Sequence, residues 1–167
     1  MSAPSLRALL DTLPQRGRVT WLALRPARRA PLRVIPTLTL DPVHGIVGDR
    51  YAGRSGARQV TLIQAEHLGV VAQLLGADTL DPARLRRNIV VAGINLLALK
   101  NRRFRLGTAL VEGTGACHPC SRMEEVLGAG GYNAMRGHGG ITARVLAPGE
   151  VALGDTLALV PMPAPAA

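Results

Sequence analysis

The chain has almost no aromatic residues, which make up 2% of its 167 positions, namely Trp21, Tyr51, Phe104 and Tyr132. Because apolar residues still reach 47%, a hydrophobic core must consist mainly of Val, Leu, Ile and Ala. Four scattered aromatics provide no stacking platform for single-stranded nucleic acid. Long apolar runs are also lacking, since no stretch reaches the roughly 18 residues that cross a bilayer. The composition therefore predicts a globular protein without a membrane segment.

Cysteine is scarce, with only two residues in the chain. Two cysteines exclude a disulfide-rich scaffold and the usual four-thiolate set of an Fe–S cluster. Residues 1–15 lack the basic start and apolar core of a signal peptide. We therefore expect a cytoplasmic protein, and its length suggests one main domain.

Lysine is almost absent, yet the net charge is +9, because nineteen of the twenty basic residues are Arg and Lys100 is the exception. A genome rich in G and C enriches Arg, Ala, Gly and Pro together, which is one explanation of the count. It does not explain why arginines flank Asn88. Arg offers a planar fork of donors that suits phosphate and other oxyanions. No helical stripe of basic residues appears, which argues against a nucleic-acid partner.

The chain divides into three parts. Residues 1–16 form an N-terminal extension with a helix, since Ser5 is a suitable N-cap and leucines recur at helical spacing up to Leu13. Residues 17–160 are predicted to form the main domain. The tail of residues 161–167, rich in Pro and Ala, is predicted to be disordered.

Short apolar segments bounded by turn residues predict strands over residues 18–24, 33–40, 58–63, 88–91, 106–112, 141–146 and 156–160. Pro36 disturbs the second of these, because proline cannot donate a ladder hydrogen bond. Helices are expected over residues 64–75 and 121–127, with a short one after Asp81, and a turn is expected over residues 147–150. This pattern predicts a mainly β fold with helical additions, shaped as a β-barrel.

Both cysteines lie in one turn, Gly113-Thr-Gly-Ala-Cys-His-Pro-Cys-Ser-Arg-Met123. Cys117 and Cys120 have the spacing of a dithiol redox motif, but such a motif opens a long helix, and here glycines at 128–131 interrupt it. A zinc site would need about four ligands, and only His118 is near in sequence. A thiolate that binds the metal of an organic cofactor and a buried structural cysteine both remain as alternatives.

Other segments accompany this turn: Gly48-Asp-Arg-Tyr51, Arg58-Gln-Val-Thr61, Arg86-Arg-Asn-Ile-Val-Val-Ala-Gly93, Gly137-His-Gly-Gly-Ile-Thr-Ala-Arg-Val-Leu146 and Gly149-Glu-Val-Ala-Leu-Gly-Asp155. In this order and at these spacings, the chain resembles a MOSC domain, the module named after the C-terminal part of molybdenum cofactor sulfurases. The resemblance covers about residues 17–160 and implies the MOSC-type β-barrel, in agreement with the strand pattern.

The resemblance implies roles for several residues. Cys120 would be the catalytic residue and the ligand to molybdenum, and Arg86 and Asn88 would bind the pterin part of the molybdenum cofactor (molybdopterin). Arg58 and Thr61 could also reach an anionic cofactor. Arg87, in contrast, is expected to be a surface residue of a short helix.

The resemblance also implies an activity, namely reduction of small N-hydroxylated compounds by an oxidoreductase that receives electrons from a separate electron-transfer protein. Two alternatives remain: a sulfur carrier with a persulfide on Cys120, and a non-catalytic cofactor-binding module. Pyridoxal phosphate is not expected as a cofactor, because nothing marks Lys100 as buried. His138, in a glycine turn, is expected to be exposed and without a role.

Overall fold

Short strands and short helices make up the chain in the computed structural model, which describes residues 1–51, 53 and 55–163. The strands among these residues are β1 (Gly17–Leu24), β2 (Arg33–Val34), β3 (Thr37–Asp41), β4 (Gly45–Ile46), β5 (Val60–Gln64), β6 (Ile89–Ala92), β7 (Arg103–Leu106), β8 (Ala109–Ala116), β9 (Ile141–Ala147), β10 (Gly149–Ala152) and β11 (Thr156–Leu159). The helices are α1 (Leu6–Asp11), α2 (Ala65–Leu74), α3 (Ser121–Leu127) and α4 (Gly131–Met135), with 3-10 helices η1 (Pro82–Leu85) and η2 (Leu96–Leu99). Of the predicted disordered tail, residues 161–163 form no helix or strand, and residues 164–167 lie outside the described residues.

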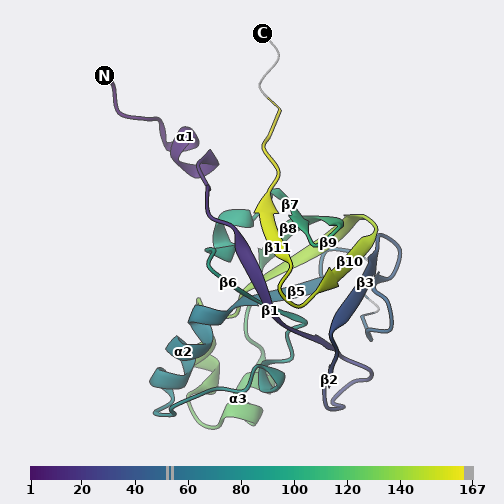
Figure 1. Cartoon of the computed structure of the whole chain (residues 1–167). Coiled ribbons are helices and arrows are strands. Elements are labelled where there is room, and N and C mark those ends of the chain that lie inside the picture. The colour runs from purple at the N-terminus through teal and green to yellow at the C-terminus, as the bar shows by residue number, and fades with distance from the viewer. Residues whose placement is uncertain (52, 54, 164–167) are drawn as a thin grey trace.

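Within this part of the chain, seven strands close a barrel in the order β1, β11, β7, β8, β9, β5 and β6, and β6 pairs with β1 (Figure 1). β5 and β6 are parallel, and the other neighbours in the barrel are antiparallel. A parallel pair requires a long crossover connection, and here the crossover contains α2 and η1. The prediction of a mainly β barrel with helical additions is confirmed.

A smaller sheet joins β10, β3 and β4 beside the barrel. Pro36 separates β2 from β3, which fits the disturbance expected at this proline. The prediction of a turn over residues 147–150 holds only for Pro148, because β9 extends to Ala147 and Gly149 begins β10. Val151 of β10 is buried and lies opposite Leu38 of β3. Pairing with a distant strand therefore decides the conformation here.

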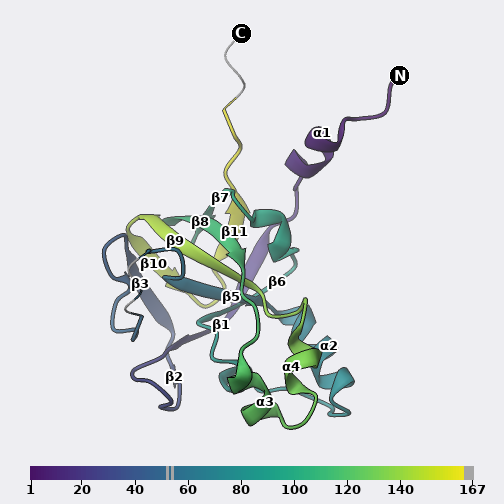
Figure 2. The same ribbon diagram turned by 180° about the vertical axis from the view of Figure 1, so that it is seen from behind.

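Successive residues of β5 and β6 contribute to two hydrophobic clusters, as the alternating faces of a strand require. Leu62 and Ile89 belong to the main cluster. Ile63 and Val90 belong to a second cluster with residues of α2, α3 and α4. These helices lie together at one end of the barrel (Figure 2). The same end carries the cysteine turn, because residues 117–120 connect β8 to α3.

The N-terminal helix α1 lies away from the barrel (Figure 1). Ser5 is its N-cap, and the Ser5 hydroxyl accepts the backbone N–H of Ala8 at 3.2 Å. Leu6, Leu9 and Leu10 are exposed, so the leucine face of this helix is not packed on the domain. No helix among the described residues is both long and apolar enough to cross a membrane.

Candidate functional site

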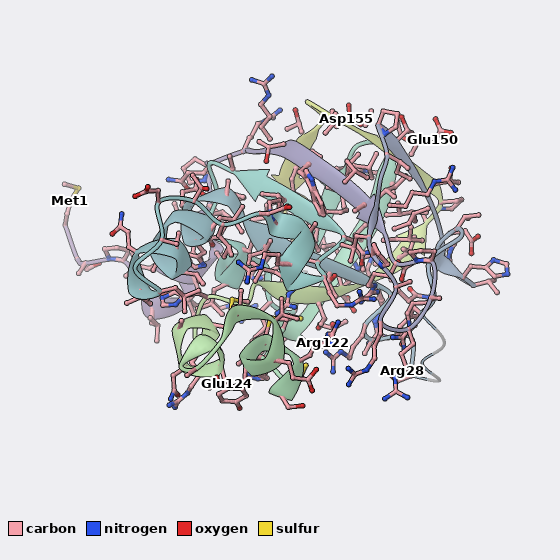
Figure 3. The ribbon with its side chains drawn as sticks, turned by 90° about the horizontal axis from the view of Figure 1, so that it is seen from below. Met1, Arg28, Arg122, Glu124, Glu150 and Asp155 are labelled. Carbon is pink, nitrogen blue, oxygen red and sulfur yellow. The ribbon has the colours of Figure 1, made fainter. Side chains whose placement is uncertain are left out.

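The cysteine turn forms one wall of a cavity of about 340 Å³ between the barrel and α3. Eight of the described residues that line it are arginines, and we call it the arginine cavity. Its lining residues are Arg25, Arg28, Arg29, Arg50, Arg58, Thr61, Leu85, Arg86, Arg87, Cys117, His118, Cys120, Ser121, Arg122 and Met123. Figure 3 shows Arg28 and Arg122 on the same side of the molecule.

The two cysteines differ in accessibility. Cys117 is 5% exposed, whereas Cys120 is exposed at the start of α3, where it occupies the N-cap position. The carbonyl oxygen of Cys120 accepts the N–H of Met123 at 2.9 Å, which fixes the turn into the helix. Of the two thiols, that of Cys120 is the one available to a ligand, as the family resemblance implies.

Asn88 does not line the arginine cavity but lies fully buried behind Thr61. Its Oδ1 accepts the backbone N–H and the hydroxyl of Thr61 at 3.2 and 2.9 Å. Its Nδ2 donates to the Ala23 carbonyl at 3.2 Å and to Asp49 Oδ1 at 3.0 Å. An amide has two N–H donors, so none is left for a ligand. Asp49 in turn holds Arg25 through a 2.8 Å ion pair, and Asn88 therefore acts on the cavity through these neighbours.

Arg86 lines the cavity and has a left-handed backbone conformation at the end of η1, with φ +57°. Its guanidinium donates to the carbonyl oxygens of Ala30 at 2.6 Å and Ala27 at 3.3 Å. These bonds hold the loop that carries Arg28 and Arg29. Burial and the neighbouring guanidiniums, that of Arg25 first, lower the pKa of Arg86.

Arg87 is 6% exposed, so the expectation of a surface residue is wrong. Its guanidinium donates to the carbonyl oxygens of Leu85 at 2.7 Å, Gly139 at 2.9 Å and Cys117 at 3.5 Å. Burial lowers the pKa of Arg87, but these carbonyl oxygens satisfy the charge. Arg87 lies between η1 and β6, and its burial follows from the carbonyl oxygens that surround it rather than from a local sequence pattern.

The glycine loop over residues 137–140 packs against the cysteine turn. The Gly140 carbonyl accepts the N–H of Cys117 at 2.8 Å. A Cβ atom on Gly139 would overlap the Cys117 carbonyl oxygen, and Gly140 has φ +84°. Only glycine allows both the close approach and the left-handed backbone. This loop is thus a support of the cysteine turn, held in place by Arg87.

Positive charge dominates the arginine cavity. Asp49 neutralises Arg25, and Glu125 of α3 pairs with Arg29 at 3.2 Å and Arg122 at 3.0 Å. Arg58 and Thr61, both predicted from the sequence, line the cavity beside Arg86 and Cys120. Arg87 adjoins Arg86, and the other arginines come from three distant parts of the chain: residues 25–29, Arg50 and Arg122. Guanidinium groups provide the hydrogen-bond donors and the charge that suit an oxyanion such as a phosphate.

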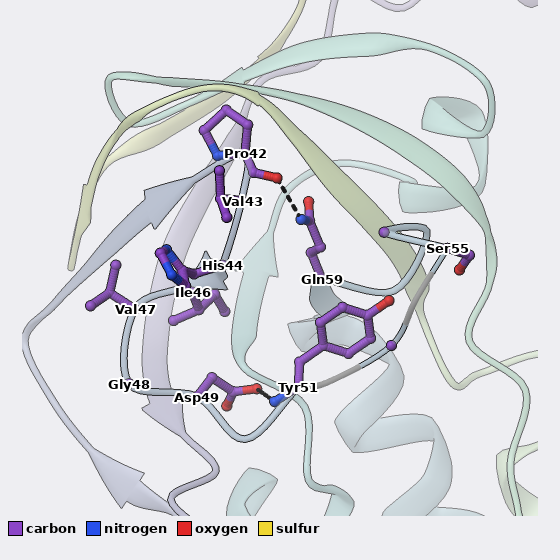
Figure 4. Close-up of a pocket in the computed structure, with 12 residues that line it drawn as sticks. Pro42, Val43, His44, Ile46, Val47, Gly48, Asp49, Tyr51, Ser55 and Gln59 are labelled. Carbon is purple, nitrogen blue, oxygen red and sulfur yellow. Dashed lines mark hydrogen bonds between the residues drawn. The ribbon is translucent and has the colours of Figure 1, made fainter.

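A larger cavity of about 550 Å³ lies within the loop of residues 42–59 (Figure 4). Gln59 closes it by donating to the Pro42 carbonyl at 2.9 Å. Its described lining residues include His44, Asp49 and Tyr51 but neither an arginine nor a cysteine. The arginine cavity, although smaller, is therefore the one that contains the cysteine and the arginines predicted from the sequence.

No three His, Cys, Asp or Glu side chains among the described residues lie close enough together to hold a metal ion. The donors that do converge are one exposed soft sulfur and several guanidiniums. This set fits an anionic organic group that brings its own metal and takes one thiolate from the protein. In this respect the residues fit the molybdenum cofactor.

The fold and the site together define a β-barrel protein with a cationic, thiol-bearing cavity under one end of the barrel. Residues 42–158 match the MOSC domain, and the chain belongs to this family, which is associated with binding of the molybdenum cofactor. No match was found among curated proteins.

Three solved structures have the same fold. YuaD from Bacillus subtilis superposes with a TM-score of 0.76 at 21% sequence identity, over 89% of this chain and 98% of that one. YiiM from Geobacillus stearothermophilus superposes with a TM-score of 0.71 at 16% sequence identity, over 86% of this chain and 75% of that one. YiiM from Escherichia coli superposes with a TM-score of 0.66 at 21% sequence identity, over 86% of this chain and 69% of that one.

Proposed function

We propose that this protein binds the molybdenum cofactor in the arginine cavity and reduces small N-hydroxylated compounds. The observation that carries the proposal is the exposed Cys120 thiol at a cavity lined by arginines. A soft thiolate suits molybdenum, and guanidinium groups suit the phosphate of a pterin cofactor. The family to which the chain belongs supports the same cofactor.

Each residue then has a distinct task. Cys120 binds the metal, and Arg86 and Arg58 bind oxygen atoms of the cofactor, while the Thr61 hydroxyl, which donates to Asn88, supports the cavity wall. Asn88 fixes Thr61 from behind. When bound, the cofactor supplies two-electron redox chemistry. The overall reaction takes a hydroxylamine R–NH–OH, two electrons and two protons to the amine R–NH₂ and water, with cleavage of the N–O bond. A separate electron-transfer protein delivers the electrons, because two cysteines are too few to bind the usual Fe–S clusters.

The exposed thiol of Cys120 also meets the requirement of a persulfide carrier, which is the second candidate function. In that case the cavity would bind a cofactor whose sulfur is exchanged. The measurable difference is a sulfur atom on Cys120 that cyanide releases. A non-catalytic cofactor-binding module would show neither this sulfur nor reductase activity.

The decisive experiment is metal analysis of the protein made in a host that synthesises the molybdenum cofactor. We expect Cys120→Ser to lose molybdenum and Cys117→Ser to keep most of it, with Cys117→Ser as the matched control. Equal loss from both variants would favour a dithiol function. The loaded protein, supplied with an artificial electron donor, should reduce an N-hydroxylated base. Full loading without turnover, together with a cyanide-releasable sulfur, would favour the carrier.

A further inference from the structure

The N-terminal helix α1 presents an apolar face that the described part of the chain leaves uncovered. Leu6, Leu9 and Leu10 recur at helical spacing on one side of the helix and are 72%, 56% and 62% exposed. Leu13, just beyond the helix, packs on the main core cluster and anchors this end of α1 to the barrel. The helix is thus attached to the domain in a way that leaves its leucines in contact with solvent.

The length of α1 also indicates that its leucines contact another surface. The helix has six residues, and isolated helices shorter than about 12–15 residues are marginal in water. Contacts of its apolar face would stabilise it. Helix α1 lies outside residues 42–158, which match the MOSC domain. This face is therefore an addition to the family fold and calls for a role of its own.

A second apolar segment lies beside α1. The segment that follows β11 leaves the barrel at the same end as α1, which is the end opposite α2 and α3 (Figures 1 and 2). A groove of about 800 Å³ runs between them, with Leu6 and Leu10 on one side and Leu159 and Met162 on the other. We call the exposed apolar residues of these two segments the leucine surface: Leu6, Leu9, Leu10, Pro161 and Met162.

Basic residues accompany the leucine surface. Arg102 lines the groove itself, and the carbonyl oxygen of Arg103 accepts the N–H of Val160 at 2.9 Å, where the C-terminal segment leaves the barrel. The acidic side chains that pair with basic residues here are Asp11 and Glu112. The basic residues lie on α1 or on the segment beside it, and they are Arg7, Lys100, Arg102 and Arg103. Positive charge is therefore in excess around the apolar side chains.

This charge distinguishes between the possible occupants of the leucine surface. Two copies of the chain that met at this surface would bring the same basic residues face to face, and like charges repel. An anionic lipid bilayer attracts basic residues, and its headgroup region accepts apolar side chains. Leucines on a projecting helix can enter a bilayer surface without a complementary cavity on the partner. Charge and shape thus favour a bilayer over a second copy or an acidic protein.

We propose that the leucine surface binds an anionic lipid bilayer. The leucines of α1 insert among the headgroups, and Arg7 and Arg103 lie near the lipid phosphates. Apolar and electrostatic contacts act together, and stable attachment of a peripheral protein requires such a pair of signals. The cysteine turn lies at the other end of the barrel, so the arginine cavity stays open to water. The proposal is independent of the cofactor and of the proposed reductase activity.

The test is co-sedimentation of the full-length protein with vesicles of phosphatidylcholine and phosphatidylglycerol in equal parts. We expect binding to these vesicles and much weaker binding to pure phosphatidylcholine. Leu6→Ala combined with Leu9→Ala should weaken binding by at least about tenfold, because two apolar side chains no longer insert. Arg7→Gln should weaken it by about fivefold, the effect of one basic residue near an anionic surface. The replaced side chains are exposed, so the melting temperature should not change.

Two matched variants show whether the effects are local. Leu74 of α2 is 60% exposed at the opposite end of the molecule, and Leu74→Ala should leave vesicle binding unchanged. Arg33→Gln, on the exposed strand β2, lowers the net charge as much as Arg7→Gln does. It should weaken binding far less than Arg7→Gln. Equal losses from Arg33→Gln and Arg7→Gln would show that total charge alone is responsible and would overturn the assignment to α1.

Insertion is measured with Leu9→Trp and brominated phospholipids, which quench tryptophan on contact. Trp21, the one tryptophan of the chain, packs against the cluster next to the helices at the other end. We expect quenching of the fluorescence from position 9 and not of that from Trp21. Failure to bind vesicles up to millimolar lipid, or binding without this quenching, would overturn the proposal. A lipid-free dimer in analytical ultracentrifugation that Leu6→Ala with Leu9→Ala dissociates would also overturn it and would assign the leucine surface to a second copy.

Discussion

Replacing Asn88 by aspartate tests how the arginine cavity is held together. The change keeps Oδ1, which accepts the two hydrogen bonds from Thr61. It replaces Nδ2, which donates to the Ala23 carbonyl at 3.2 Å and to the Asp49 carboxylate at 3.0 Å, by a second oxygen. In the variant two carboxylate oxygens would face each other in a fully buried position.

The size of the effect follows from this geometry. Leaving an uncompensated charge in a buried network costs about 3–5 kcal/mol, a large share of the roughly 5–15 kcal/mol that stabilises a typical domain. For a chain of this length each kcal/mol shifts the melting temperature by about 2–4 °C. We therefore expect Asn88→Asp to lower the melting temperature by roughly 6–20 °C. Asn133→Asp, on the surface of α4, should change the stability by less than about 0.5 kcal/mol.

Thermal and urea unfolding of four proteins, arranged as a double-mutant cycle, measure the contact itself. Asp49→Asn in the Asn88→Asp background places an amide opposite the new carboxylate and restores a donor between the two residues. The double variant should therefore be more stable than the sum of the two single changes predicts. Additive losses, or a loss below about 1 kcal/mol for Asn88→Asp, would refute the role assigned to this network.

Two further predictions concern the cysteines and His67. In the native protein, iodoacetamide should alkylate Cys120 and should not react with the buried Cys117 until the chain is unfolded. Intact mass spectrometry measures this, and equal alkylation rates for the two cysteines would contradict the difference in their accessibility. The pKa of His67 is lowered on folding, so the unfolded state binds more protons as the pH falls below about 6.5, and the free energy of unfolding should decrease there. Between about pH 7.5 and 5, the free energy of unfolding should depend less on pH in His67→Gln than in the wild type, whereas His44→Gln should behave as the wild type does. The same pH dependence of unfolding in His67→Gln and the wild type would exclude a contribution of His67.

Local patterns in the sequence were sufficient for much of the fold. The apolar run at residues 89–91 predicted a buried strand, and β6 is buried on both faces because it separates the barrel interior from the helices. The helix predicted over residues 64–75 is α2, at residues 65–74. Both elements carry an apolar pattern of their own that matches their packing.

Elements that depend on distant partners were missed. The strand expected over residues 106–112 includes parts of two strands, β7 and β8, which Gly107 and Thr108 connect, and the φ of +57° at Gly107 permits the turn. Residues 149–152 form a strand because β3 pairs with them. α4 begins at Gly131, inside a glycine-rich stretch that favoured a loop. Helix and strand propensities describe local preferences and do not include contacts between segments that are distant in sequence, so a single sequence does not show these contacts.

For the candidate site too, some residues were predicted from the sequence and others were not. The family resemblance selected Cys120, Arg86, Arg58 and Thr61, and the fold brings these four to one cavity. The position of Asn88 behind Thr61 and the burial of Arg87 follow from three-dimensional packing, and neither leaves a mark in the spacing of residues. Their binding roles remain predictions, although their structural roles are visible in the hydrogen bonds.

Gathering arginines around one cavity has a cost, because like charges repel and buried guanidiniums lose hydration. The chain offsets this cost with fixed partners: Asp49 for Arg25, Glu125 for Arg29, and carbonyl oxygens for Arg86 and Arg87. These partners also fix the directions in which the guanidiniums point before any anion binds, so little ordering remains to be done at binding. The charged residues thus gather on one side of the cysteine turn, around the arginine cavity that Cys120 also lines.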